Sequence, residues 1–406
     1  MPSISSINQQ VINFANASIS SASIPFVSTV TTMGFNTGDN IHWVATGTGV
    51  NNTGSAIVTN SLGIIGSASI SVSGLPLFAS TFNVFLLSAQ ISGTILKTIE
   101  NAQNVGGSPA TTLGTYGWYA GGNDTTGGTV LSSVVRIDYS NDSPTAASPR
   151  GKLSVQRNNF GATFNANYGW VGGGQLPGST GSSVDRIDYA VDTNAAVTRG
   201  PLSSARYGLS ATGNVYYGWF ISGKSTSNID RIDYASDNST AVFRVAISIP
   251  TVNFIQDHAA VGNIYYGWFG GGTPAATGTN IYRIDYSNDS INVSTRGPLS
   301  STTGAAAGNW TYGWFVGGRT PVSTVQRIDF ANDTTNASPR GPLNIARRNL
   351  AGSGNADYGW FGGGVTPTNV SSVERIDYNN DTLTATVRGT LGGTRTEFSA
   401  TSNYVK

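Results

Sequence analysis

The stretch DYGWFGGGVTPTNVSSVERIDYNNDT, residues 357–382, decides the fold because the chain repeats it. A close copy, TYGWFVGGRTPVSTVQRIDFANDT, occupies residues 311–334. The triplet Tyr-Gly-Trp occurs six times at intervals of 46 to 52 residues, beginning at Tyr116, Tyr168, Tyr217, Tyr266, Tyr312 and Tyr358. Self-similarity at a fixed period of this length predicts one supersecondary unit that recurs along the chain.

Two further markers follow every triplet in the same order. Arg-Ile-Asp supplies the pairs Arg136 and Asp138, Arg186 and Asp188, Arg231 and Asp233, Arg283 and Asp285, Arg327 and Asp329, and Arg375 and Asp377. Arg-Gly-Pro-Leu or a variant begins at Arg150, Arg199, Arg244, Arg296, Arg340 and Arg388. Between these markers lies a polar segment ending in Asp, which is typical of a capped turn.

Each unit divides into four short strands. In the third unit LSATGN, residues 209–214, precedes the triplet, and the triplet itself opens the second strand. The third strand contains Arg-Ile-Asp with alternating polarity, and the fourth leads into the Arg-Gly marker. Four short strands in roughly 48 residues are typical of a propeller blade. The sequence therefore predicts an all-β protein with a six-bladed β-propeller over residues 104–406.

The units resemble kelch repeats in their Gly-Gly pair and in the aromatic residue that follows it in the third strand. The pairs are Gly121-Gly122, Gly173-Gly174, Gly270-Gly271, Gly317-Gly318 and Gly363-Gly364. The third unit departs with FISGK at 220–224, and tryptophan lies in the second strand instead of the fourth, so the array is kelch-like. It is also similar to Tyr-Gly-Trp-Phe-Gly-Gly-Gly and Arg-Ile-Asp-Tyr arrays in virion and tail proteins of marine phages. These resemblances imply a propeller and a component of a virus particle.

The end of the chain predicts how the ring closes. FSATSN, residues 398–403, matches LSATGN, residues 209–214, whereas the first unit lacks this strand. We expect the C-terminal strand to complete the first blade. This arrangement removes an open sheet edge that would otherwise pair with other chains.

The repeated charges are interpreted as structural. Arg and Asp two residues apart share one face of a strand, and a partly buried charge between packed blades needs a partner. A catalytic group is normally placed once, whereas these groups recur in every unit. We therefore predict a six-fold belt of salt bridges and turn caps, and no carboxylate site among the twelve Arg-Ile-Asp charges.

The segments that differ between units are the candidates for recognition. The connection from second to third strand reads NDTTGGTVLSS in the first unit, KSTSN in the third and RTPVST in the fifth. Rigid elements that present variable loops are a common basis for binding. Lys224 and Arg319 are rare charges in these loops and are the predicted ligand-facing residues. Variation without any ligand remains an alternative.

Composition argues against several classes of function. The net charge is +1, which predicts no contact with nucleic acid. The sequence contains no run of about 18 apolar residues, so we predict no insertion into a membrane. The chain has no cysteine and only His42 and His258, so we predict no metal, no cofactor and no catalytic site. His258 has no nucleophile motif around it and is interpreted as packed or solvated. The unrepeated acidic residues show no pairing pattern: Asp185, Asp257, Glu374 and Glu397 among them.

The N-terminal part differs in composition from the repeats. Residues 1–96 contain one charged side chain, Asp39, and the composition changes at 101–112, which is typical of a linker. We predict a Ser- and Asn-rich arm at 1–25 and a β-sandwich-like domain at 26–103. Because interface cores are depleted of charge, this domain is interpreted as a docking domain that contacts other subunits.

Together these features predict a non-enzymatic virion structural protein: a phage tail, fibre or capsid-decoration component on the surface of an extracellular particle. Its expected partners are other virion proteins and copies of itself, through the N-terminal domain, and a host-surface glycan or protein. The alternative is a secreted lectin or carbohydrate-active enzyme on a kelch-like propeller. A cleft with paired, unrepeated carboxylates would favour the enzyme.

Overall fold

The computed structural model describes the backbone of the strands within 26–106, and residues 115–124, 128–142, 146–224, 226–248, 254–274 and 278–404 with their side chains. The chain divides into two compact units, residues 1–111 and 112–406. This division lies within the linker stretch 101–112, later than the boundary expected between 103 and 104, because β7 (Gln103–Gly106) pairs with a strand of the first unit. The arm expected at 1–25 lies outside the described residues.

The described part of the first unit is a sheet of antiparallel strands. They are β1 (Phe26–Met33), β2 (Asn40–Gly47), β3 (Val50–Leu62), β4 (Ile65–Val72), β5 (Thr81–Ile91), β6 (Thr94–Lys97) and β7. Their order is β1-β4-β3-β2-β5-β6, with β7 also on β5. The long strand β3 pairs with β2 along its first part and with β4 along its second. The described part of this unit is thus all-β and forms one sheet, and the β-sandwich-like arrangement and docking role expected for residues 26–103 stay predictions.

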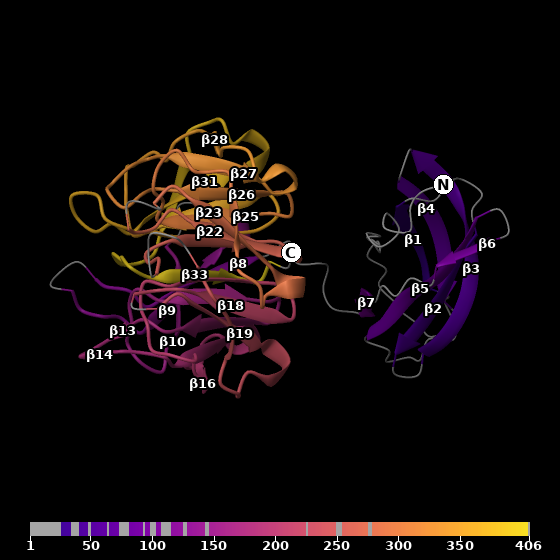
Figure 1. Cartoon of the computed structure of the whole chain (residues 1–406), viewed down its shortest axis with the longest axis horizontal. Coiled ribbons are helices and arrows are strands. Elements are labelled where there is room, and N and C mark those ends of the chain that lie inside the picture. The colour runs from indigo at the N-terminus through magenta and orange to yellow at the C-terminus, as the bar shows by residue number, and fades with distance from the viewer. Residues whose placement is uncertain are drawn as a thin grey trace. The chain divides into compact units, whose positions relative to one another are not determined.

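The second unit contains six four-stranded antiparallel sheets, which confirms the six-bladed propeller (Figure 1). Blade 1 contains β33 (Ser399–Ser402), β8 (Tyr116–Ala120), β9 (Ser133–Asp138) and β10 (Ser148–Lys152). Blade 2 contains β11 (Gly161–Phe164), β12 (Tyr168–Gly172), β15 (Val184–Asp188) and β16 (Val197–Arg199), with a small hairpin of β13 (Gln175–Leu176) and β14 (Ser179–Thr180) in its loop. Blade 3 contains β17 (Ser210–Gly213), β18 (Tyr217–Ile221), β19 (Asn228–Asp233) and β20 (Val242–Ala246).

The remaining blades repeat the pattern. Blade 4 contains β21 (Ala259–Gly262), β22 (Tyr266–Gly270), β23 (Ile281–Asp285) and β24 (Ser294–Arg296). Blade 5 contains β25 (Ala305–Gly308), β26 (Tyr312–Val316), β27 (Val325–Asp329) and β28 (Ser338–Pro339). Blade 6 contains β29 (Ala351–Gly354), β30 (Tyr358–Gly362), β31 (Ser372–Asp377) and β32 (Thr386–Thr390).

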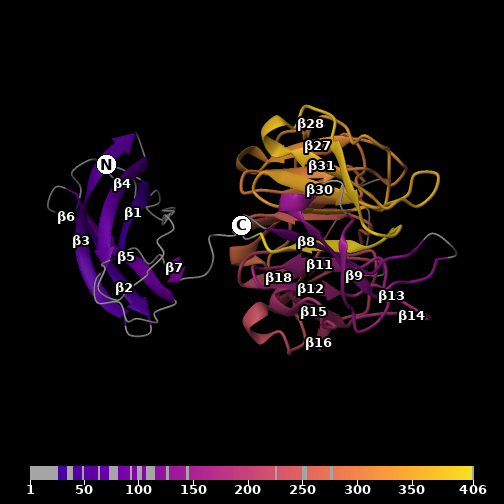
Figure 2. The same cartoon turned by 180° about the vertical axis from the view of Figure 1, so that it is seen from behind.

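The ring closes through the C-terminal strand, as the sequence predicts. β33 pairs with β8 in antiparallel register from Ser399↔Ala120 to Ser402↔Gly117, and blade 1 is thus built from both ends of the unit. The Tyr116 amide donates to the Asn403 side-chain oxygen at 3.1 Å. Figure 2 shows the consequence: the yellow strands of blade 6 lie next to the magenta strands of blade 1.

Each pair of neighbouring blades encloses an apolar cluster centred on a tryptophan of the triplet. Every triplet tryptophan is almost completely buried and stacks on the aromatic residue that follows Arg-Ile-Asp in the next blade, with ring centroids 3.7–4.0 Å apart. Trp360 of blade 6 stacks on Tyr139 of blade 1 and completes the circle. The repeated tryptophan of the triplet and the aromatic residue after Arg-Ile-Asp therefore form the contacts between neighbouring blades.

In blades 1, 2 and 6 both residues of the Gly-Gly pair end the second strand in a conformation that other residues rarely adopt. Gly173 and Gly174 have φ angles of 71° and 102°, in the left-handed region where a side chain is strained. In the departing third unit, Ser222 takes the first of these positions with φ 49°, and its hydroxyl accepts a hydrogen bond from the Ile255 amide. The strand-ending turn is thus kept although the glycine is lost.

Candidate functional site

The arginines of Arg-Ile-Asp form salt bridges to the next blade. Each guanidinium lies 2.9–3.1 Å from the carboxylate of a turn aspartate in the neighbouring unit. The pairs are Arg136–Asp192, Arg186–Asp237, Arg231–Asp289, Arg283–Asp333, Arg327–Asp381 and Arg375–Asp142. The partner is therefore not the aspartate two residues further along the same strand.

Each turn aspartate accepts hydrogen bonds from a tryptophan and from arginines of the preceding blade. Asp289, 2% exposed, accepts from Trp219 Nε1 at 2.7 Å and pairs with Arg231 at 3.1 Å and Arg244 at 2.6 Å. The Arg-Ile-Asp arginine also lies over its own triplet tyrosine, as Arg231 lies 4.5 Å from the Tyr217 ring centroid. Because these carboxylates are buried and fully partnered, they form joints between blades and offer no site for a ligand.

The aspartates of Arg-Ile-Asp cap short 3₁₀ helices. Asp138, Asp188, Asp233, Asp285, Asp329 and Asp377 each accept a hydrogen bond from the backbone amide two residues on. The helices are η1 (Tyr139–Asn141), η2 (Tyr189–Val191), η3 (Tyr234–Ser236), η5 (Tyr286–Asn288), η6 (Phe330–Asn332) and η7 (Tyr378–Asn380). The belt thus contains both salt bridges and caps, but different aspartates supply them.

A second set of buried arginines was not recognised in the sequence. Arg157, Arg206, Arg347 and Arg395 stand three residues before Phe160, Leu209, Leu350 and Phe398, so a recurring Arg-x-x-Phe/Leu pattern would have revealed them. Asp185 and Glu374, taken above as unpaired acids, are the partners of Arg157 and Arg347. In blade 3 Arg206 pairs with Asp230 at 2.9 Å.

Arg395 is the exception, since Val135 occupies the position of the acid in blade 1. Its guanidinium donates to the backbone oxygens of Gly121 and Ser133 at 2.7 and 2.9 Å. Burial lowers the pKa of Arg395 to about 10. Arg157, Arg347 and Arg395 thus bond to backbone oxygens at both ends of the second-to-third-strand loop and hold it in place.

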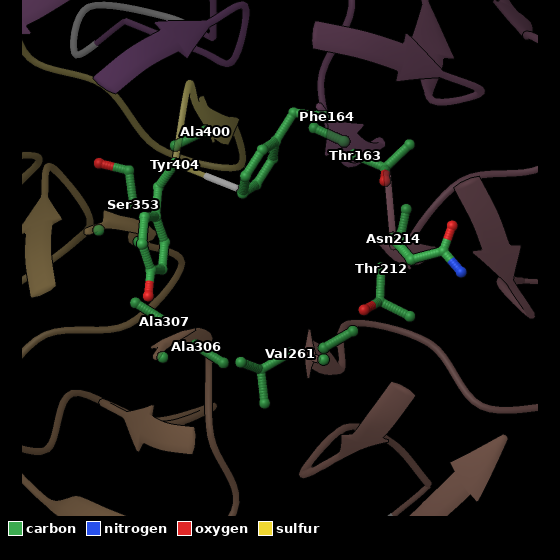
Figure 3. A pocket seen from close by; sticks show the side chains of 18 of the residues that line it. Thr163, Phe164, Thr212, Asn214, Val261, Ala306, Ala307, Ser353, Ala400 and Tyr404 are labelled. Atoms are coloured by element: carbon green, nitrogen blue, oxygen red, sulfur yellow. The ribbon is translucent and has the colours of Figure 1, made fainter. Parts of the chain in front are cut away.

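The first strands of the blades surround a channel. β33, β11, β17, β21, β25 and β29 each contact their equivalents on both sides. A narrow cavity of about 100 Å³ lies between them, and Figure 3 shows Thr163, Thr212, Val261 and Ser353 around its opening, with the Phe164 and Tyr404 rings at one side. One small residue per blade lines both this channel and a wider cavity beyond it: Ala162, Ala211, Ala260, Ala306, Gly352 and Ala400.

The wider cavity, about 340 Å³, is a polar bowl at the ends of the strands where the second-to-third-strand loops and the links between blades emerge. Its rim includes a collar of five residues with left-handed φ angles of 50–68°: Asn159, Gly208, Asp257, Asn349 and Glu397. Backbone amides join them from blade to blade, with Glu397 N to Asn349 O, Asn159 N to Glu397 O, Gly208 N to Asn159 O and Asp257 N to Gly208 O at 2.7–3.1 Å. Four of the five are not glycine, and such conformations concentrate at functional sites.

Two of the unrepeated acids, Asp257 and Glu397, line the bowl from the links into blades 4 and 1, and the charge of Asp257 acts on Glu397. Desolvation raises the pKa of Glu397, and the Asp257 carboxylate raises it further against the pull of Asn159, Arg348 and Asn123. The pKa of Asp257 is also raised, because desolvation by the surrounding walls outweighs the nearby positive charges of Arg319 and Lys224. Two interacting carboxylates therefore face one cavity.

The predicted ligand-facing residues lie at this bowl. Arg319 lines it directly and is exposed. Lys224 is exposed and its ammonium lies 5.2 Å from the ring centroid of Tyr207, which lines the bowl. Arg348, from the link into blade 6, also lines it. The loop residues expected to face a ligand thus lie on the same face as the bowl, and their role in binding stays a prediction. The residues at the centre of the bowl come from the links between blades.

Among the residues described with side chains, no group of three or more histidine, aspartate or glutamate residues is arranged to hold a metal ion. Within the same part of the chain, no helix has the length and apolarity needed to cross a bilayer. No protein-family model matches the chain, and no curated protein matches it at a significant level. The bowl is thus the candidate site on geometry alone: a rigid, polar cavity suited to binding.

Proposed function

We propose that this chain is a non-enzymatic structural protein of a virus particle whose propeller binds a host surface through the bowl. The proposed binding role rests on a difference between the repeated and the unrepeated charged residues. The repeated charged residues form salt bridges between blades and cap 3₁₀ helices. The unrepeated charged residues line one cavity: Asp257, Arg319, Arg348 and Glu397. A frame of identical blades that presents one irregular cavity is suited to recognition.

The particle role rests on sequence features. Residues 40–96 contain no charged side chain, which favours an interface with other subunits, and the repeats resemble arrays in phage virion proteins. The first unit is accordingly proposed to dock on other virion proteins or on copies of itself. A phage tail, fibre or capsid decoration would place the propeller at the outer surface of the particle.

The particle role is tested by electron microscopy of purified virions with gold-labelled antibody against the propeller. Regular labelling at one position on the particle is expected. Label confined to cell debris, with bare particles beside it, would reject the virion role while leaving the binding role of the bowl open.

A secreted lectin or carbohydrate-active enzyme is the second candidate, and one observation favours its enzymatic form. Asp257 and Glu397 lie in the same cavity with raised pKa values, and glycoside hydrolases use two carboxylates of which one is a proton donor. Incubation of the full chain with a glycan panel separates the two. Retention of glycan without new reducing ends supports adhesion, whereas turnover that both Asp257→Asn and Glu397→Gln abolish supports the enzyme.

A further inference from the structure

The basic side chains that form no salt bridge gather at the bowl. In the part of the propeller described with side chains, fifteen arginines pair with a carboxylate. In this part of the chain five basic residues do not: Lys152, Lys224, Arg319, Arg348 and Arg395. Arg319 and Arg348 line the bowl, and the Lys224 ammonium lies over the ring of Tyr207, which lines it too. The positive charges that the salt bridges between blades do not use are thus concentrated at one cavity.

The two arginines of the bowl come from neighbouring backbone segments. An isolated β-bridge pairs Gly318, in the loop of blade 5, with Arg348, in the link into blade 6. Arg319 follows Gly318 directly, and both arginine side chains are exposed. Like charges held close together repel each other, so an anion that binds both guanidiniums offsets this repulsion. The arrangement therefore favours a negatively charged group at this part of the rim.

The other charges of the bowl interact with these arginines. Arg319 and Lys224 both act on the carboxylate of Asp257, and Arg348 acts on that of Glu397. Three cationic side chains thus oppose two carboxylates. The buried Arg395 adds a positive charge that no carboxylate matches among the described residues, since its guanidinium donates to backbone oxygens. A cavity with an excess of one sign of charge attracts ligands of the opposite sign.

The two carboxylates place a second requirement on the ligand. Glu397 already accepts from three asparagine amides. Asp257 is exposed, and its carboxylate lies beside the collar, where a Cβ on Gly208 would come within 2.9 Å of it. An ionised carboxylate only accepts hydrogen bonds, so a ligand beside Asp257 must supply O–H or N–H donors. Sulfate, which has no donor, meets the first requirement and not the second.

An acidic monosaccharide combines a negative charge with several donors in a small volume. Guanidiniums bind planar carboxylates through two parallel hydrogen bonds, so a carboxylate suits the two arginines. Hydroxyl groups supply the donors that Asp257 requires. The bowl, about 340 Å³, lies at the lower end of the range for ligand pockets, about 300 to 1,000 Å³, and suits a ligand of the size of one sugar ring.

We propose that the bowl binds an acidic sugar, with the ligand carboxylate between Arg319 and Arg348 and a ring hydroxyl donating to Asp257. Lys224 adds a third positive charge at the edge of the site. This inference rests on the proposed binding role of the bowl and names its ligand class. A site that pairs with both the charge and the hydroxyls discriminates against an analogue that lacks either, because its own groups are then left unpaired.

The direct test separates the charge of the ligand from its hydroxyls. Dissociation constants are measured by NMR titration of the full-length protein with D-glucuronate, D-galacturonate and N-acetylneuraminate. The amides of these sugars keep the hydroxyls without the charge, and sulfate carries charge without a donor. At least one acidic sugar is expected to bind about tenfold or more tightly than its amide and than sulfate. Binding of none of the three, or equal binding of the amide or of sulfate, would overturn the inference.

Variants of the two arginines locate the site. Arg319→Gln and Arg348→Gln are each expected to weaken binding of the acidic sugar about tenfold or more, the loss expected for a charge-assisted hydrogen bond. Arg319→Lys keeps the charge without the planar fork, and its affinity is expected to lie between those of the wild type and Arg319→Gln. Because both arginines are exposed and form no salt bridge, the variants are expected to fold, which circular dichroism melting verifies.

Lys152→Gln is the matched control. Lys152 is also exposed and without a salt bridge among the described residues, but it ends the outer strand β10 and does not line the bowl. Its substitution is expected to leave the affinity for the acidic sugar unchanged. A loss in Lys152→Gln as large as in the arginine variants would show attraction by net charge alone and would contradict the site.

The outcomes separate the two proposals. If the wild-type protein binds neutral glycans on an array but none of the acidic sugars, or if both arginine variants bind acidic sugars as well as the wild type, the inference about the ligand fails and the binding role of the propeller stands. If the wild-type protein binds no glycan on an array of neutral and acidic glycans and does not attach to cells, both proposals fail.

Discussion

Asp285 and Asp289 flank the same short helix, η5, yet their side chains have opposite environments. Asp285 accepts from the Ser287 amide at the surface, at 2.9 Å. Asp289 is buried and holds Trp219, Arg231 and Arg244 of the preceding blade. At the scale of single residues, the repeat thus uses one kind of side chain for a local cap and for a joint between sheets.

Asp289→Asn is expected to lower the free energy of unfolding by about 3 kcal/mol, because it leaves two half-buried guanidiniums without a carboxylate. Asp285→Asn is the matched control and is expected to cost less than about 1 kcal/mol, since asparagine caps helices nearly as well. Urea unfolding followed by tryptophan fluorescence measures both. Equal losses in the two variants would contradict the joint described for Asp289.

The glycine after the third-marker arginine is required by close approach of the next blade. A Cβ at Gly297 would lie 1.8 Å from the Thr335 backbone oxygen, whereas a Cβ at Gly393 would meet nothing within 4 Å. Gly297→Ala is therefore expected to cost about 3 kcal/mol through overpacking, and Gly393→Ala to have little effect. Thermal melts of the two variants decide this, and a stable Gly297→Ala protein would show that the blades can separate there.

At the scale of elements, the sequence predicts the blades well because three markers recur in fixed order and the third strand alternates in polarity. It does not show which aspartate pairs with which arginine, since strand periodicity gives the face of a side chain but not the neighbour across it. The bowl was harder to foresee. Asp257 and Glu397 come from links between blades whose sequences differ from one blade to the next. The left-handed backbone of the collar has only a weak signature, the preference of asparagine and aspartate for that region.

Strand β33 is the element on which ring closure depends. Deletion of residues 396–406 is expected to lower the melting temperature of the whole propeller, because β8 loses one of its two partner strands and the bowl loses Glu397. Circular dichroism melting measures the change, and an unaltered midpoint would contradict it. A synthetic peptide of residues 396–404 is expected to restore much of the loss by strand addition, whereas a scrambled peptide is not.

At the scale of the whole molecule, Glu397 links three neighbouring blades. Its carboxylate accepts from Asn123, Asn159 and Asn349 at 2.9, 3.1 and 3.3 Å, from the loop of blade 1 and from the links into blades 2 and 6. One carboxylate therefore connects the blades on both sides of the point where the ring closes.

The raised pKa of Glu397 gives its contribution a defined pH dependence. The folded state binds this proton more tightly than the unfolded state, whose pKa is about 4.5. The stabilising effect is thus complete below about pH 4.5 and is lost as pH rises through the folded pKa. Melting of the wild type and of Glu397→Gln from pH 4 to 7 measures it. The wild-type advantage is expected to shrink with rising pH, and an advantage that grows would contradict the shift.

The pairing of β33 with β8 has a consequence for biosynthesis. The Tyr116 amide and its partner Asn403 are 287 positions apart, so a nascent chain on the ribosome exposes the bare edge of β8 until translation of the repeats is finished. Such distant pairing slows folding and leaves an adhesive edge open to other chains. Slow synthesis at low temperature, or a chaperone that shields this edge, is therefore expected to decide the yield of soluble rings.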